Sequence, residues 1–159
     1  MFLLLVFKQS SVDQVETEMQ IINSNPFFNR ISRDKDAYSE EEVLEEILQA
    51  EKIGAKRFIL MDDNQPIGIF EYLLLNPNDQ HTWLGLLLIN KEFHSKGYGE
   101  AALKQYNEMM KSEGIFTYRL GVVAENDPGH RFWKKHGCRE ISSTINEFSK
   151  RIIIYENKL

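Results

Sequence analysis

The chain has 159 residues and a formal net charge of −5, with 42% hydrophobic and 27% charged residues. This length and composition predict one globular domain over residues 1–159. The negative charge argues against a broad surface for nucleic acid or for an anionic membrane. The single cysteine, Cys138, excludes an internal disulfide and a multi-cysteine zinc site, and it fits a reducing compartment.

The first third of the chain opens with an apolar run that two amphipathic segments follow. Residues 2–7 predict a first strand, because the run is too short for a membrane span and lacks the marks of a signal peptide. Residues 11–24 predict a helix that "NPFFNRISRD" ends. Residues 39–54 predict a second helix, with a Ser-x-x-Glu capping box and a closing glycine. We expect a cytoplasmic protein.

Strands and helices alternate in the rest of the chain. The apolar runs "RFILMDD", "PIGIFEYLLLN" and "TWLGLLLIN", joined by short turns, predict an antiparallel meander. A helix is predicted over residues 98–112 and a strand over 117–125. "DPGHRFWKKHG" predicts a short helix with Asp127 as its N-cap. Two last strands, "REISST" and "KRIIIYEN", complete an α/β domain on a mixed sheet.

Two glycines one residue apart, Gly97 and Gly99, lie where the helix of residues 98–112 begins. Glycine in such a place serves either a turn with positive φ or a ligand that approaches the backbone closely. For so short a pattern the simple turn is the commoner explanation. The sharper interpretation is a phosphate site, because the free amides at a helix start attract anions. Those amides belong to Ser95, Lys96, Gly97, Tyr98, Gly99 and Glu100.

Two other phosphate-binding patterns can be compared with the same residues. A P-loop requires Gly-Lys-Ser/Thr, which "GYGEAA" lacks. The dinucleotide fingerprint G-x-G-x-x-A does match, and Glu125 lies roughly 20 residues later, where a ribose-binding carboxylate is expected. That fingerprint should follow its strand directly, whereas the polar stretch "KEFHSK" intervenes here. A dinucleotide-binding protein is therefore the weaker alternative.

A longer segment around these glycines, "LLLINKEFHSKGYGEAAL", resembles the acyl-CoA-binding motif of the GNAT superfamily of N-acetyltransferases. In that motif [Arg/Gln]-x-x-Gly-x-[Gly/Ala] opens a helix after a strand and a short loop. "NDPGHRFWKKHGC" resembles the second motif of the family, and the helix and strand between the two motifs also agree. The first 55 residues match in pattern only. The resemblance implies a mixed, mostly antiparallel sheet of about seven strands, splayed between the fourth and fifth, with about four flanking helices.

The resemblance also implies acetyl-CoA as co-substrate and no metal. The pantetheine arm would pair with the strand before the glycine loop, the pyrophosphate would lie on the loop amides, and Asn126 would contact the arm. Gly85 and Gly121, inside the two splayed strands, mark bulges or close backbone approaches. The cofactor-binding residues implied are Leu87, Leu88, Ile89, His94, Ser95, Lys96, Gly97, Tyr98, Gly99, Glu100, Asn126 and Trp133.

The reaction implied is direct transfer of acetyl from acetyl-CoA to a primary amine of a small molecule or peptide. A backbone N–H at Leu88 or Ile89 is the predicted oxyanion donor. An aliphatic amine is mostly protonated at neutral pH, so a base must remove a proton. Glu71, the carboxylate inside "IGIFEYLLL", is the candidate base, and a solvent-facing position on an alternating strand is the other interpretation.

The sequence departs from the family pattern at three polar positions. His94 stands where the family has arginine or glutamine, Trp133 where a tyrosine acid is common, and Trp83 where some members carry a glutamate base. An acyl-CoA sensor without catalysis therefore stays an alternative. The acidic helix 39–54 is either a solvated face or an attraction for a cationic amine. The predicted partner is the amine substrate, with no nucleic acid and no membrane, and a homodimer stays open.

Overall fold

Seven strands form one mixed sheet in the computed structural model, which describes residues 3–159. In chain order they are β1 (Val6–Gln9), β2 (Lys56–Asp62), β3 (Gln65–Leu73), β4 (Trp83–Ile89), β5 (Thr117–Val123), β6 (Arg139–Ile145) and β7 (Arg151–Lys158). They lie in the order β1-β2-β3-β4-β5-β7-β6, and each pair of neighbours is antiparallel except β4 and β5. The predicted fold class is confirmed.

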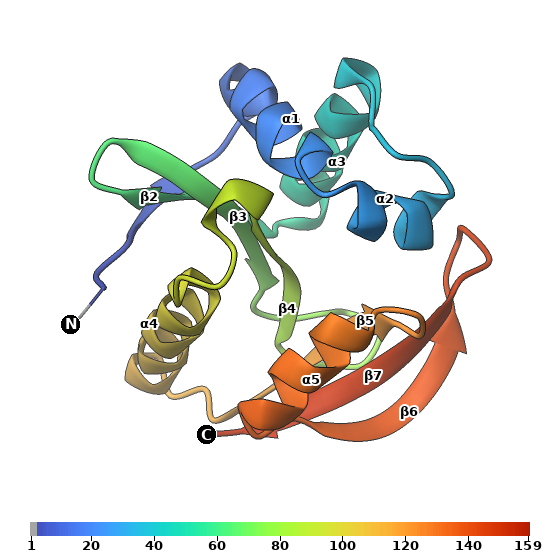
Figure 1. The fold of residues 1–159 in the computed structure, drawn as a ribbon. Coiled ribbons are helices and arrows are strands. Elements are labelled where there is room, and N and C mark those ends of the chain that lie inside the picture. The colour runs from blue at the N-terminus through green and yellow to red at the C-terminus, as the bar shows by residue number, and fades with distance from the viewer. Residues whose placement is uncertain (1–2) are drawn as a thin grey trace.

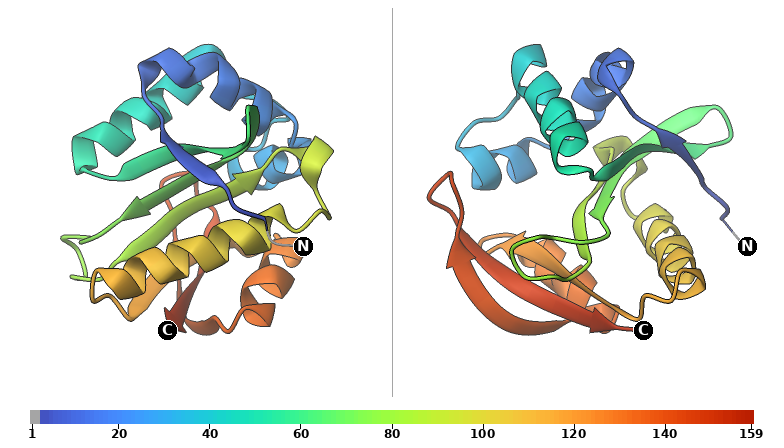
Figure 2. Two further views of the ribbon diagram at one scale, coloured as in Figure 1. Left: turned by 90° about the vertical axis from the view of Figure 1, so that its left-hand side faces the viewer. Right: turned by 180° about the vertical axis from the view of Figure 1, so that it is seen from behind.

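The described residues form five α-helices, which cover both faces of this sheet. They are α1 (Val15–Asn23), α2 (Pro26–Arg33), α3 (Glu40–Ile53), α4 (Tyr98–Ser112) and α5 (Asp127–Lys135), with short 3₁₀ turns at Val12–Gln14 and Lys91–Phe93. Figures 1 and 2 show α1, α2 and α3 together on one side, and α4 and α5 on the other. Each face therefore has its own hydrophobic core.

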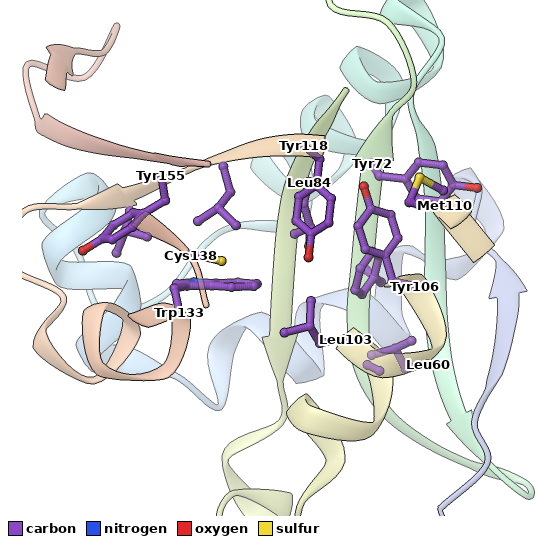
Figure 3. Close-up of a cluster of buried hydrophobic side chains, with 14 of the residues drawn as sticks. Leu60, Tyr72, Leu84, Leu103, Tyr106, Met110, Tyr118, Trp133, Cys138 and Tyr155 are labelled. Atoms are coloured by element: carbon purple, nitrogen blue, oxygen red, sulfur yellow. The ribbon is translucent and has the colours of Figure 1, made fainter. Parts of the chain in front are cut away.

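The larger core lies under α4 and α5 (Figure 3), where Tyr106 and Tyr118 are fully buried. Trp133 and Cys138 belong to the same cluster. Burial raises the pKa of the Cys138 thiol to about 11, so the thiol is protonated at neutral pH. The smaller core joins α1 and α3 to β2, β3 and β4.

The sheet opens between β4 and β5, as predicted. These strands share a single registered pair, Trp83 with Arg119, and then diverge (Figure 1). Gly85 lies at an irregularity beside this pair, because the register between β3 and β4 shifts after Glu71. At Gly121 on β5, an added Cβ would lie 2.8 Å from the side chain of Ile152. Gly85 thus marks a bulge and Gly121 a close approach.

Two predicted boundaries in the first third of the chain are wrong. The first strand begins at Val6, not at residue 2, and residues 1–2 lie outside the described part of the chain. Before it, Leu5 exchanges two hydrogen bonds with the side chain of Gln105, of 2.8 and 2.9 Å, in place of a strand partner. The segment predicted as a break, 25–34, contains α2, because Pro26 suits the first turn of a helix.

The N-cap of α5 is Asn126 and not the predicted Asp127. The Asn126 side chain accepts a hydrogen bond of 3.0 Å from the Gly129 N–H. Both Asn and Asp can cap a helix, so residue type does not decide between Asn126 and Asp127. The backbone position at which the helix begins decides it. The predicted capping box of α3, formed by Ser39 and Glu42, is confirmed, as is Gly54 at its end.

A buried ion pair fastens α1 to the sheet. Glu18 is fully buried, and Arg57 on β2 is 6% exposed. The guanidinium Nη2 of Arg57 lies 2.6 Å from Glu18 Oε1, and the hydroxyl of Ser10 donates a 2.7 Å hydrogen bond to Glu18 Oε2. A charge buried this deeply is tolerated only while its partners are in place.

Replacing Arg57 alone should therefore destabilise the fold strongly. We expect Arg57→Met to lower the free energy of unfolding by about 3–5 kcal/mol, because Glu18 is left buried and uncompensated. Adding Glu18→Leu should restore most of that loss, since the fully buried carboxylate that Arg57 compensates is then gone as well. Urea unfolding of the three proteins measures both effects. A double variant less stable than Arg57→Met would contradict this account.

Candidate active site

The backbone of β4 offers hydrogen-bonding groups to the opened side of the sheet. The Asn90 N–H donates to the carbonyl of Ile67 on β3 at 2.8 Å, and the antiparallel register places Leu88 opposite Ile69. Backbone groups alternate along a strand, so Leu88 directs its N–H and C=O to β3 while Leu87 and Ile89 direct theirs toward β5. Of the two predicted oxyanion donors, the Leu88 N–H thus faces β3 and the Ile89 N–H faces the opening.

The start of α4 lies beside this strand end and presents free amides. The first backbone hydrogen bond of the helix joins the Ala101 N–H to the carbonyl of Gly97, so the amides of Tyr98, Gly99 and Glu100 have no acceptor within the helix. Gly97 has a backbone φ of +84°, which residues other than glycine rarely adopt. At Gly99 an added Cβ would lie 3.3 Å from the ring of Phe132. The turn and the packing of α4 against α5 thus account for both glycines.

A cavity of about 650 Å³ connects these two features. Its wall includes the end of β4, the start of α4, the start of α2 and one side of α5. Of the predicted cofactor residues, the following line it: Leu87, Leu88, Ile89, His94, Ser95, Gly97, Tyr98, Gly99, Glu100, Asn126 and Trp133. Lys96 does not line it, and its ammonium lies over the ring of Phe93, which does. We call this space the β4–α4 cavity.

The polar side chains of the β4–α4 cavity are partly committed to the protein itself. His94 Nε2 lies 2.8 Å from the Ile89 carbonyl, so this nitrogen carries the proton and donates it. Asn25 Nδ2 donates to the same carbonyl at 3.1 Å. Asn126 uses its oxygen to cap α5, which leaves its Nδ2 as a donor. Trp133 is 8% exposed and packs edge-on against Phe132.

A second cavity, of about 840 Å³, lies on the opposite side of β4 under α2 and α3. It also borders Val123 of β5 and the tip of the β6–β7 hairpin, where Phe148 stacks on Arg33 at 4.3 Å. Its charged lining is mainly acidic and consists of Glu42, Glu45, Glu46, Glu71 and Glu147, with Arg33, Lys52 and Arg57. We call this space the acidic cavity.

Leu88 and Phe28 line both cavities, so the two spaces meet at the end of β4. An elongated ligand in the β4–α4 cavity would therefore bring its end to the floor of the acidic cavity. The arrangement suits a reaction between two molecules that approach from opposite sides of one strand.

The predicted base, Glu71, faces the acidic cavity, where its Oε1 accepts a 2.7 Å hydrogen bond from Arg57 Nη1. It is therefore not the solvent-facing residue of the alternative interpretation. The nearby Glu46 lies 3.4 Å from Arg57 Nη2 and 3.9 Å from Arg33. Burial raises the pKa of the Glu46 carboxyl above its ordinary value. The predicted acidic helix divides accordingly: Glu42, Glu45 and Glu46 line the cavity, and Glu40, Glu41 and Glu51 do not.

The sequence reasoning missed most of the acidic cavity. Arg57 begins an apolar strand, and Glu18 lies in an ordinary amphipathic helix, so no motif marks either residue. The position of Phe28 was missed as well, because no helix is predicted over residues 25–34. The signal that could have found α2 is an Asn before a Pro, which is typical of a helix start.

Within residues 3–159, no group of three or more His, Cys, Asp or Glu side chains is arranged to hold a metal ion. In the same part of the chain, no helix is both long and apolar enough to cross a membrane.

Comparison with known structures places this arrangement among acetyltransferases. An acetyltransferase from Thermus thermophilus superposes with a TM-score of 0.84 at 20% identity, with both chains fully covered. An N-acetyltransferase named PaiA from Thermoplasma acidophilum, in complex with coenzyme A, gives 0.69 at 22% identity, covering 98% of this chain and 99% of its own. A chimera of the Vibrio cholerae spermidine N-acetyltransferase SpeG gives 0.70 at 14%, covering 97% and 94%.

These likenesses establish the fold. No curated protein sequence matches the chain. The model of the Acetyltransferase (GNAT) family matches residues 19–138, which is well over half of the chain and includes both resembling motifs. The chain therefore belongs to the GNAT family of acetyltransferases.

Proposed function

We propose that the protein transfers an acetyl group from acetyl-CoA to a primary amine, without a covalent enzyme intermediate. The observation that carries this proposal is the meeting of the two cavities at Leu88 and Phe28. One side of β4 offers backbone groups and helix amides, and the other offers carboxylates. These are the surroundings that a phosphate-bearing thioester and a cationic amine respectively require.

The β4–α4 cavity fits the cofactor by its size and its donors. A volume of about 650 Å³ lies in the usual range for ligand sites. The amides of Tyr98, Gly99 and Glu100, with the α4 dipole behind them, would hold the pyrophosphate. Leu87 and Ile89 would pair with the amide groups of the pantetheine arm like a neighbouring strand. Acetyl-CoA would supply an activated thioester at the far end of that arm.

The backbone of β4 would also support the transition state. Attack of an amine on the thioester places negative charge on the carbonyl oxygen, and a fixed N–H close to it lowers the barrier. The amides of Leu87 and Ile89 face the opening, whereas that of Leu88 serves the sheet. We therefore place the oxyanion donor at one of these two residues.

The acidic cavity would bind the amine. Its five glutamates outnumber its three basic residues, which favours a cation over an anion. A carboxylate there, with Glu71 as the candidate from the sequence, would accept the proton that the ammonium must lose. The proposal covers small amines and peptide N-termini alike. It also includes a cytoplasmic location, because the free thiol of Cys138 fits a reducing compartment.

Acetyl-CoA should bind to the purified protein in a calorimetric titration, with NAD as the parallel ligand. We expect Lys96→Glu to weaken binding about tenfold, because it places a negative charge beside the pyrophosphate. Lys111→Glu, at the other end of α4 and with the same change of net charge, should bind as the wild type does. A response to NAD and none to acetyl-CoA would favour the dinucleotide-binding alternative instead.

An enzyme and a sensor differ in what an amine does to the bound thioester. We expect free thiol to appear when acetyl-CoA and the protein are mixed with a primary amine, and not when the amine is omitted. Diamines should react faster than monoamines of the same length, since the acidic cavity favours the molecule with two positive charges over the one with a single charge. Release of thiol is followed with a chromogenic disulfide reagent. Tight binding of acetyl-CoA with no release by any amine would identify a sensor.

A further inference from the structure

The buried charges around Arg57 do not balance. Three carboxylates, those of Glu18, Glu46 and Glu71, lie within 3.4 Å of this one guanidinium. The second cation of the cluster, Arg33, lies 3.9 Å from Glu46. It also pairs with Glu42 and stacks on the rings of Tyr38 and Phe148. One carboxylate of the cluster is thus poorly compensated.

The distances identify which carboxylate that is. Glu18 receives bonds from Nε and Nη2 of Arg57 and from the Ser10 hydroxyl, and Glu71 receives a 2.7 Å bond from Nη1. Glu46 is left with contacts of 3.4 Å and 3.9 Å, which are long for charge-assisted hydrogen bonds. Its position also allows proton exchange, because Glu46, like Glu71, lines the acidic cavity, whereas Glu18 does not.

From these contacts we propose that Glu46 takes the proton from the amine substrate, and that Arg57 is the residue that positions it. The assignment rests on the proposed acetyl transfer and deepens it. Glu71, whose carboxylate accepts the 2.7 Å hydrogen bond from Arg57, serves instead to attract and orient the ammonium. Glu71 pairs with Leu86 of β4, two residues before Leu88 at the junction of the cavities. Glu46 and Glu71 contact the same Arg57 guanidinium, which places both carboxylates on this side of β4. In the proposed step a bridging water relays the proton from the amine to Glu46.

The step balances as follows. The ammonium R–NH₃⁺ gives one proton to the Glu46 carboxylate, and the freed lone pair forms the bond to the acetyl carbon. The C–S bond breaks and its electron pair leaves with the CoA thiolate. That thiolate takes the second proton from the nitrogen, giving the amide and free thiol. Glu46 then releases its proton to water, so the net products are amide, thiol and one proton.

Charged and titratable groups from several elements surround the Glu46 carboxyl and set its pKa. The charged and titratable groups that face it are Arg57 on β2, Glu71 on β3, Glu18 on α1, Arg33 on α2, Tyr38 before α3 and Glu42 on α3. Desolvation raises the pKa of Glu46, and the two arginines oppose that rise only in part. By contrast, the Lys35 ammonium beside Glu42 lowers the pKa of that carboxyl to about 2. Glu42 and Glu46, one helical turn apart, thus have carboxyl pKa values displaced in opposite directions.

The test compares Glu46→Gln, Glu71→Gln and the matched control Glu51→Gln, which removes a charge from an exposed part of α3. We expect Glu46→Gln to lower kcat by about 10²- to 10⁴-fold at pH 7, with acetyl-CoA binding unchanged. The defect should shrink as the pH approaches about 10, where the amine loses its proton without help. Glu71→Gln should instead raise KM, and Glu51→Gln should change neither parameter.

The pH profile separates a proton acceptor from a merely structural residue. In the wild type, kcat/KM should rise with pH through the ionisation of Glu46, at a pH above the ordinary glutamate value. In the Glu18→Leu/Arg57→Met double variant, this rise should move to higher pH, because losing the Arg57 cation raises the pKa of Glu46 by more than losing the Glu18 charge lowers it. A constant defect of Glu46→Gln at every pH, or a pH-dependent one for Glu71→Gln, would overturn the assignment. Wild-type protein that acetylates no amine would instead refute the proposed function, and this inference with it.

Discussion

One short set of contacts joins β4 to β5, and it determines where the sheet opens to form the site. The two strands are joined where the Arg119 N–H donates to the Thr82 carbonyl at 2.9 Å, and where the Trp83 indole and the Arg119 guanidinium reach the same Asp79 oxygen, at 2.8 and 3.5 Å. Beyond this point nothing in residues 3–159 pairs the strands in register. Trp83, at a position where some family members carry a glutamate, thus has a structural task here. The sheet opens because these contacts are confined to the start of β4.

An opened sheet leaves backbone groups that must find partners, and this requirement connects the fold to its chemistry. At Ile89 the carbonyl is satisfied by His94 and Asn25, which explains why the loop before α4 turns back onto the strand. The N–H and C=O of Leu87 face the same opening. From Leu86 to Ile89 the same strand is paired with β3 in unbroken register, and an added Cβ at Gly68 would lie 2.7 Å from the Leu88 carbonyl. One edge of β4 is therefore structural and the other is available.

The sequence predicted the lining of the β4–α4 cavity better than that of the acidic cavity, and the reason is physical. The β4–α4 cavity depends on local features, namely a strand end, a positive-φ turn and a helix start, and these leave recognisable residues such as Gly97 and "NDPG". The acidic cavity depends on side chains from α1, α2, α3, β2 and β3 that meet only after folding. No spacing in the sequence links Glu18 to Arg57, which are 39 positions apart.

The same reasoning explains why the acidic helix was hard to interpret. Its first-turn glutamates serve the capping box and the helix dipole, as a solvated face would. Yet Glu46, one turn further along, faces inward toward Arg57 and Arg33. A glutamate that points into a cavity looks identical in the sequence to one that points into water. What distinguishes them is the desolvation that raises the pKa of Glu46, and that is a property of the neighbours that the fold supplies.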